Sequence, residues 1–260
     1  AYTGAIRARL RCSAEVPGKR ARTLRFVAGL AVIGLFAHPA QAQQVGDPAA
    51  DTSAPPPFVT ALDAIPWITS EPHSEPEAWL LAFVDVETTG LVPGWHEMID
   101  LGIVMTDLEG RPIDSLFVRI QPEHPERTSP GAVAVNGFDA QRWRQLDARA
   151  PSAAIAEWVE FHERVAAGRP VLMVAFNSHF DTAFLDHLMR GEGRTWRELY
   201  HYFVLDLPSM AWSLGMRELT GAGLSQRLGV PDEPRVADEH TGLTGARLNA
   251  RLYRALRTVR

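Results

Sequence analysis

The stretch Leu80-Leu81-Ala82-Phe83-Val84-Asp85-Val86-Glu87-Thr88-Thr89-Gly90-Leu91 determines how the rest of the chain is interpreted. Its apolar run of β-branched and aromatic residues is typical of a buried strand, which Thr-Thr-Gly ends. Asp85 and Glu87 interrupt the run, and residues two apart on a strand face the same side. Two carboxylates on an apolar strand are costly unless a cation binds them. The stretch therefore indicates either a divalent-metal site at the carboxyl edge of a sheet or two acids that begin a surface turn.

A second polar cluster follows another expected strand, in Ala175-Phe176-Asn177-Ser178-His179-Phe180-Asp181. Here a strand ends and a helix begins, so Asp181 should lie near a helix N-terminus and face the same edge as Asp85 and Glu87. The alternative for Asp181 is a helix-capping aspartate, which is common.

Residues 1–42 have the composition of a secretory signal peptide. Seven basic residues and one acid accompany a twelve-residue apolar run, Phe26 to Ala37, which is followed by an Ala-Gln-Ala end at Ala42. A basic segment, a short apolar segment and an Ala-x-Ala end are the three parts of such a peptide. Twelve apolar residues are few for a membrane span, so an uncleaved anchor is the less favoured alternative. We expect an exported protein, periplasmic or secreted, with no stable membrane insertion after cleavage. A mis-called start would instead leave it in the cytoplasm.

The rest of the chain is acidic. The full sequence has 26 Lys and Arg and 31 Asp and Glu, so residues 43–260 retain 19 basic and 30 acidic side chains, about −11, with no lysine. This balance excludes a broad surface that coats polyanions. A nucleic-acid substrate would have to be held by metal ions and local arginines. The single cysteine, Cys12, precedes the expected cleavage site and indicates nothing about the redox compartment.

Beyond the signal peptide we expect two segments. Residues 43–76 are rich in Pro and Ala and read as a linker. Residues 77–260 read as one folded domain. After the opening strand, its pattern predicts further strands at 97–106, 113–120, 170–176 and 202–205. Helices are predicted to start at 129–130 and to cover 151–167, 181–190, 210–214, 224–228 and 239–258. An antiparallel meander followed by alternating strands and helices predicts an α/β sheet covered on both faces.

Together the two acidic motifs resemble those of the DEDD 3′–5′ exonuclease superfamily, of the DEDDh type, which includes ribonuclease T, oligoribonuclease and the proofreading subunit of bacterial DNA polymerase III. Phe83 to Leu91 is similar to its first motif and Asn177-x-x-Phe180-Asp181 to its second. The resemblance spans roughly Trp79 to Tyr253. It implies a ribonuclease-H-like three-layer α/β/α exonuclease fold with a mixed central sheet. It also implies two divalent ions, Mg²⁺ or Mn²⁺, and a free 3′ end of single-stranded DNA or RNA, or of short oligonucleotides, as the substrate.

The third motif departs from the family pattern. The histidine subclass has a His followed five residues later by an Asp, and the best match places His240 at the His but Gly245 at the Asp. A shifted register with Arg235 at the His position loses both residues. Asp238 and Glu239 lie seven and six residues from position 245, up to roughly 10 Å along a helix, so neither reaches the same point without rearrangement.

The resemblance assigns roles to the matching residues. Asp85, Glu87 and Asp181 are expected to hold the metal, with Asp85 bridging both ions. His240, whose ordinary pKa is near 6.5, is expected to take the proton of the attacking water. Substrate contacts are expected from six residues, listed here: Thr88, Thr89, Gly90, Leu91, Asn177 and Phe180.

The sequence thus predicts a metal-dependent 3′–5′ exonuclease with a two-metal mechanism. Because Gly245 stands where the family has an Asp, the alternative hypothesis is a catalytically weak, nucleic-acid-binding member of the same fold. A phosphodiesterase acting on small nucleotides is a third. In the last helix, Arg247, Arg251, Arg254 and Arg257 form either a phosphate-contacting stripe or a solvated helix face.

Overall fold

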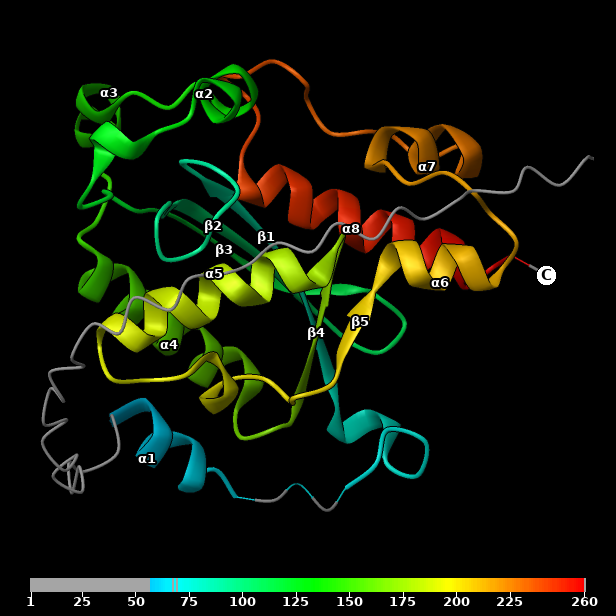
Figure 1. Ribbon diagram of the computed structural model, residues 1–260. Coiled ribbons are helices and arrows are strands. Elements are labelled where there is room, and N and C mark those ends of the chain that lie inside the picture. Colours follow the sequence, from blue (N-terminus) through cyan, green and yellow to red (C-terminus); the bar gives the residue numbers. More distant parts are fainter. Residues whose placement is uncertain (1–56, 67, 69, 260) are drawn as a thin grey trace, which may run out of the picture. The chain divides into compact units, whose positions relative to one another are not determined.

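The computed structural model describes residues 57–66, 68 and 70–259, which form a five-stranded mixed sheet covered by helices (Figure 1). The strands are β1 Leu80–Thr88, β2 Met98–Thr106, β3 Pro112–Arg119, β4 Val171–Ala175 and β5 Val204–Asp206. Their order in the sheet is β3-β2-β1-β4-β5. β1 pairs antiparallel with β2 and parallel with β4. The carboxyl ends of β1 and β4, which carry the two acidic motifs, therefore meet at one edge of the sheet.

The helices follow the predicted pattern closely. They are α1 Pro57–Asp63, α2 Pro130–Asn136, α3 Ala140–Gln145, α4 Pro151–Ala166, α5 Ser178–Gly191, α6 Leu207–Ser213, α7 Gly221–Leu228 and α8 Gly242–Leu256. Short 3₁₀ turns lie at η1 Pro76–Ala78, η2 Pro125–Arg127 and η3 Trp196–Glu198. α2 begins at Pro130 because the Ser129 side chain caps it.

The central strand buries both of its faces. Leu80, Ala82, Val84 and Val86 belong to the core that includes α4 and α5. The alternate residues Leu81 and Phe83 belong to the core that includes α6 and α8. Successive side chains of a strand point to opposite faces, so β1 lies in the middle of three layers. This confirms the expected α/β/α fold with a mixed central sheet.

α8 approaches the sheet unusually closely, through glycines. A Cβ on Gly102 of β2 would overlap the backbone of Gly242, and a Cβ on Gly242 would lie 2.5 Å from the carbonyl oxygen of Asp85. Two hydrogen bonds fix this contact: Gly242 N–H donates to Asp100 Oδ1 at 2.9 Å, and Asn249 Nδ2 donates to the Val84 carbonyl at 3.1 Å. The start of α8 is therefore held directly against the acidic end of β1.

Two expectations need correction. The segment 43–76 is expected to be a Pro/Ala-rich linker, but its described part contains the helix α1, and η1 begins at its last residue, Pro76. The helix α1 is retained because the Phe58 ring packs under the Arg190 guanidinium, 4.3 Å away, and Pro57 lies against Gly193. The second is α3, which the sequence pattern did not reveal. It is capped by Asp139, and it buries Trp143, whose Nε1 donates to the Ile99 carbonyl at 2.7 Å.

The predicted signal peptide, residues 1–42, lies outside the described residues, as does the linker up to residue 56. Within the described part of the chain, no helix has the length and apolar character needed to cross a membrane.

Replacing Gly102 with Ala should destabilise the fold by about 3 kcal/mol or more, because the new methyl group meets backbone atoms of α8 that cannot move aside cheaply. The matched control is Gly191→Ala, at a helical glycine whose Cβ would meet nothing within 4 Å. That change should be neutral or slightly stabilising. Chemical denaturation of the two variants measures the difference, and equal stabilities would contradict the close packing of α8.

Candidate active site

Three acids, two of them buried and Asp85 half-buried, gather where β1 ends. Asp85 and Glu87 lie on the α8 side of β1, and Asp100 of β2 is the register partner of Glu87. Side chains of directly paired residues lie on the same face of a sheet. Glu87 is 7% exposed and Asp100 1% exposed, so the surface-turn reading of the first motif is wrong.

Asp181 joins this group from the first turn of α5. It is 2% exposed and is not the helix cap, because that position belongs to Asn177, which has a left-handed backbone (φ 66°). The start of α5 is instead satisfied by Asp206 at the end of β5, whose Oδ1 accepts the Ser178 N–H at 3.0 Å. Asp181 is thus free of the capping role that was its alternative explanation.

Uncompensated negative charge dominates the site. Burial, and then the charges of Asp181 and Glu87, raise the pKa of Asp85 well above its usual range. Burial also raises the pKa of Asp181, with Glu87 adding to the effect. Burial and the neighbouring Glu87 raise the pKa of Asp100 to about 8. A divalent cation, which prefers carboxylate oxygens, would relieve this cost.

The donor set therefore has the chemistry of a divalent-cation site. As they stand, no three His, Cys, Asp or Glu side chains in the described part of the chain are grouped closely enough to hold a metal ion. Separation is expected for like charges that repel one another across a low-dielectric site. The carboxylates Asp85, Glu87 and Asp181 would have to draw together around a cation.

His240 contacts the acids from the loop between α7 and α8. Its Nε2 lies 3.0 Å from Glu87 Oε1, and its Nδ1 lies 3.0 Å from the Pro234 carbonyl. The hydrogen bond to Glu87 raises the pKa of His240 to about 9, although partial burial opposes the shift. In this arrangement His240 is an imidazolium paired with Glu87, rather than the free base with an ordinary pKa that the sequence predicted.

Two functional-site residues were missed. Asn136 is 3% exposed, and its Nδ2 donates to Glu87 Oε2 at 3.2 Å and to the Thr88 carbonyl at 3.0 Å. Glu233 places Oε2 3.6 Å from His240 Nδ1. In the sequence, Asn136 reads only as the residue before a turn glycine, and Glu233 as one acid in a polar loop. No pattern distinguished them.

A cavity of about 390 Å³ opens beside Glu87. Four of the six residues expected to bind substrate line it, namely Thr88, Gly90, Leu91 and Phe180, together with Val135 and Asn136. The Leu91 side chain is largely solvent-exposed, at 79%. The cavity is mainly apolar and adjoins the acids, as a site for a nucleobase or sugar next to the reacting phosphate would be.

The other two expected substrate contacts lie elsewhere. Thr89 is fully buried: its Oγ1 accepts the Glu97 N–H at 2.9 Å, and its own N–H donates to the Glu97 carbonyl at 2.9 Å. It therefore anchors the loop after β1. Asn177 forms the left-handed turn from β4 into α5, and it does not line this cavity.

An exposed aromatic residue flanks the cavity loop. Trp95 is 55% exposed, and the Arg127 guanidinium lies 4.5 Å from its ring centroid. Arg127 is two residues before Ser129, which lines the cavity and whose N–H donates to the Thr89 carbonyl at 2.8 Å. Trp95 and the half-buried Arg127 therefore form a cation–π pair between segments that are close in sequence to cavity-lining residues.

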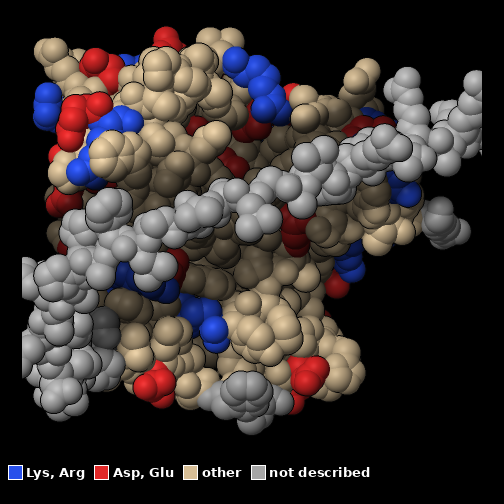
Figure 2. Space-filling view, in the orientation of Figure 1, with Lys and Arg blue, Asp and Glu red and all other residues tan. Residues whose placement is uncertain are grey.

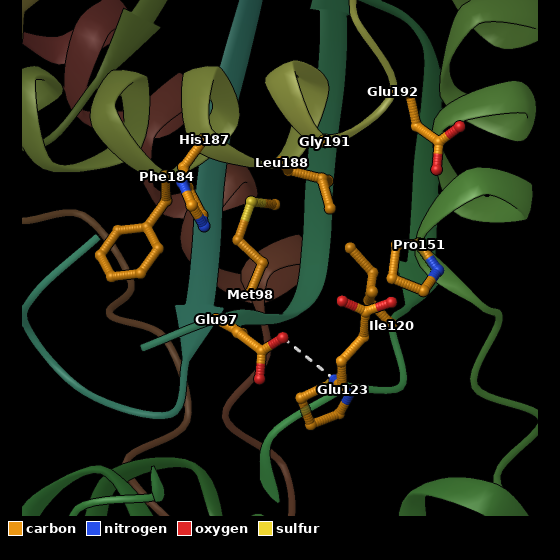
Figure 3. Close-up of a pocket in the computed structure, with 11 residues that line it drawn as sticks. Glu97, Met98, Ile120, Glu123, Pro151, Phe184, His187, Leu188, Gly191 and Glu192 are labelled. Carbon is orange, nitrogen blue, oxygen red and sulfur yellow. Dashed lines mark hydrogen bonds between the residues drawn. The ribbon is translucent and has the colours of Figure 1, made fainter. Parts of the chain in front are cut away.

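A second, smaller cavity of about 140 Å³ lies along α5, and Asp85, Glu87 and Asp181 do not line it (Figure 3). Glu97 faces it, and its carboxylate accepts the N–H groups of Glu123 at 3.0 Å and His124 at 2.7 Å. These bonds tie the chain after β3 to the start of β2. Glu97 therefore has a structural role at this cavity.

Basic side chains are dispersed. On the face shown in Figure 2 they form separate groups on a largely uncharged surface, as the acidic composition predicted. In the last helix, Arg251 donates to the Pro231 carbonyl at 3.0 Å, and Arg257 lies 3.7 Å from Glu109. These two contacts favour a structural role for that stripe over phosphate binding.

Comparison with known proteins agrees with the geometry. No protein-family model matches the chain. The 3′-5′ DNA exonuclease Cap18 of Escherichia coli is 25% identical over 177 residues, which cover 66% of this chain and 89% of that protein.

Solved structures share the fold. The match to apo Exonuclease I has a TM-score of 0.57 at 16% identity and covers 70% of this chain but only 42% of that one. The chain thus spans about two fifths of the length of Exonuclease I. The match to the nuclease domain of 3′hExo, a DEDDh family member, has a TM-score of 0.54 at 15% identity and covers 68% and 90% of the two chains. These solved structures show that the fold is shared, and the similarity to Cap18 together with the motifs confirms the resemblance to the exonuclease superfamily.

The charge cluster predicts how stability depends on pH. The pKa values of Asp100 (about 8) and His240 (about 9) lie above their ordinary values of 3.8 and 6.5. Between pH 6.5 and 8.5 the folded state therefore holds protons that the unfolded state has released, and the free energy of unfolding should fall as pH rises. His162, whose burial lowers its pKa to about 4, is neutral in the folded state over this range. In the unfolded state it loses its proton around pH 6.5, so its opposite effect on stability is confined to the low end of the range.

Chemical denaturation in EDTA at pH 6.5 and 8.5 measures this loss. Adding Mn²⁺ should raise the melting temperature more at pH 8.5, because cations bind the deprotonated carboxylates. A stability that is flat or rises with pH in EDTA, or a protein indifferent to Mn²⁺ at both pH values, would show that the acids do not form such a site.

Proposed function

We propose that this chain, whose fold and first two motifs resemble those of the DEDD-type exonuclease superfamily, hydrolyses phosphodiester bonds and releases nucleotides from the 3′ end of DNA or RNA. The observation that carries the proposal is the convergence of Asp85, Glu87 and Asp181, with His240, beside an open and mainly apolar cavity. A buried cluster of acids is suited to binding cations, and the adjoining cavity gives the substrate a place to lie.

The three acids would share the task of holding the metal ions. Asp85, at the centre of the cluster, and Asp181, across the sheet edge, would hold Mg²⁺ or Mn²⁺ together with Glu87. When bound, a pair of such ions supplies electrostatic stabilisation of the attacking and leaving oxygens of an in-line displacement. Asn136 orients Glu87 by donating to its Oε2.

His240 would accept the proton of the attacking water. Its raised pKa arises first from the hydrogen bond with Glu87. If the hydrogen bond between Glu87 and His240 is broken, the pKa of His240 falls toward its ordinary value. The imidazole is then neutral and can accept a proton at Nε2. The Pro234 carbonyl keeps Nδ1 protonated and so selects this tautomer.

The substrate is an unpaired 3′ end. The cavity offers Leu91, Val135 and Phe180 to a terminal base or sugar, and Trp95 offers an exposed ring on which a neighbouring base can stack. An Exonuclease I structure in complex with a dT13 oligonucleotide supports a single strand as the ligand of this fold.

A catalytically weak nucleic-acid-binding protein is the second candidate, and Gly245 is the observation that favours it. The two candidates make opposite predictions for turnover, so the same assay separates them.

Wild-type protein should release mononucleotides from the 3′ end of a labelled single strand in Mg²⁺ or Mn²⁺ and release none in EDTA. Asp85→Asn and Asp181→Asn should each lower the rate about 100-fold or more, since each removes an anionic ligand worth about 3 kcal/mol of transition-state stabilisation. The matched control is Asp186→Asn, on the same helix as Asp181 but paired with Arg190 at the surface. Binding of the strand without any release by folded wild type would favour the second candidate.

Export is a separate proposal, supported by the composition of residues 1–42. Expression of the full chain should yield a processed protein whose N-terminus follows Ala42, as read by N-terminal sequencing. Recovery of the intact N-terminus from the cytosol would contradict it.

A further inference from the structure

In the structure the Asp85 carboxylate fills the turn of α8 where a fourth acidic ligand would stand. A Cβ on Gly245 would overlap the Asp85 carboxylate and would lie 3.1 Å from the Asp85 Cβ. The glycine lets α8 come so close to β1 that the Asp85 carboxylate occupies the space a side chain at 245 needs. A further carboxylate for the cation site would have to come from another position.

Three other acids near α8 either have a bonding partner or are exposed to solvent. Asp238 is paired with Arg142 at 2.5 Å, and its side chain is 72% exposed. Glu239 is exposed to solvent. Asp100 is buried, but its Oδ1 accepts the first N–H of α8 from Gly242. None of the three offers an uncommitted carboxylate to Asp85.

Glu233 differs from all of these. Its side chain is 8% exposed, and its Oε2 is buried without a hydrogen-bond partner. Oε2 lies 3.6 Å from His240 Nδ1, too far for a hydrogen bond. A buried carboxylate oxygen without a hydrogen bond destabilises the fold. The position of Glu233 Oε2 near the other acids therefore suggests that this oxygen binds a cation.

The loop holds Glu233 firmly in this position. Arg235 Nη1 lies 3.0 Å from Glu233 Oε1, and Arg235 is itself bound by Asp232 at 2.8 Å. Arg251 of α8 donates to the Pro231 carbonyl and fixes the start of this segment. One oxygen of Glu233 is thus anchored by Arg235, while the other, Oε2, has no hydrogen bond and faces His240 Nδ1 at an ion-pair distance of 3.6 Å. To reach a cation held by Glu87, Oε2 would have to turn past the His240 ring.

We propose that Glu233 supplies the carboxylate that position 245 lacks, and that it binds the divalent cation together with Asp85 and Glu87. The assignment rests on the nuclease function proposed above. In this assignment the fourth acid comes from the loop before α8 instead of from position 245 of α8. The same loop carries His240, so one segment would provide both a metal ligand and the proton acceptor. Hard divalent cations accept such oxygen ligands from any element that places them in reach.

Titration of the full-length protein with Mn²⁺ by calorimetry, without nucleic acid, tests the assignment. Glu233→Gln should weaken Mn²⁺ binding about tenfold or more, because the amide removes an anionic oxygen ligand. Glu239→Gln, the same change at an exposed acid of the same loop, should bind within about twofold of wild type. Equal affinities of wild type and Glu233→Gln would overturn the assignment.

Two further variants separate a ligand from a residue that acts indirectly. His240→Ala removes a positive charge beside Glu87 and should therefore keep or tighten Mn²⁺ binding. A loss as large as that of Glu233→Gln would show that Glu233 acts through His240. Gly245→Asp should not tighten Mn²⁺ binding. A tenfold gain there would show that position 245 has room for the missing ligand, and it would overturn the assignment.

Should Glu233→Gln fail to fold, Glu233→Asp keeps the charge and withdraws the carboxylate by one methylene, and it should also weaken Mn²⁺ binding. Wild-type affinity in that variant would contradict a ligand role. Nucleotide release by wild type separates the two proposals. Release together with unchanged Mn²⁺ binding in Glu233→Gln refutes only the assignment. Glu233-dependent Mn²⁺ binding without release refutes only the nuclease function.

Discussion

Repulsion among buried carboxylates at the carboxyl end of β1 is the constraint on which the site depends. Asp85, Glu87 and Asp181 come from two elements that the sheet topology brings to one edge, and Asp100 adds a fourth charge from the paired strand. Such a group is stable only when protons or cations neutralise it. In the structure, His240 provides part of this neutralisation by pairing with Glu87. The same demand for positive charge makes the cluster a candidate cation site.

The glycine contact between α8 and the sheet sets the geometry of that cluster. Gly102 and Gly242 bring the start of α8 onto the backbone of β1 and β2, and Gly245 leaves the next turn open to the Asp85 carboxylate. A side chain at any of these positions would push the helix or the carboxylate away. Gly245 therefore has a packing role, and its replacement of an acid is not simply the loss of a ligand. The loop before α8 then becomes the nearest source of a compensating charge.

The sequence predicted most of the fold and the centre of the site because both follow local rules. Strand periodicity located β1, and the spacing of Asp85 and Glu87 placed both on one face. The loop before α8 shows where such rules end. Glu233 and Asn136 reach the site through tertiary contacts, and no local sequence pattern predicts that either residue belongs to the site. The raised pKa of His240 likewise depends on Glu87, which is 153 positions away in the chain and adjacent only after folding.

The central claim is that the acidic end of β1 binds divalent cations. Anomalous diffraction from crystals soaked in Mn²⁺ tests it directly, because the signal locates the metal independently of any activity. We predict a peak within ~2.0–2.6 Å of an Asp85 carboxylate oxygen and of at least one further carboxylate of the cluster. A fully soaked crystal with no peak at Asp85, or with manganese bound only at surface acids such as Asp107 and Glu109, would contradict the account.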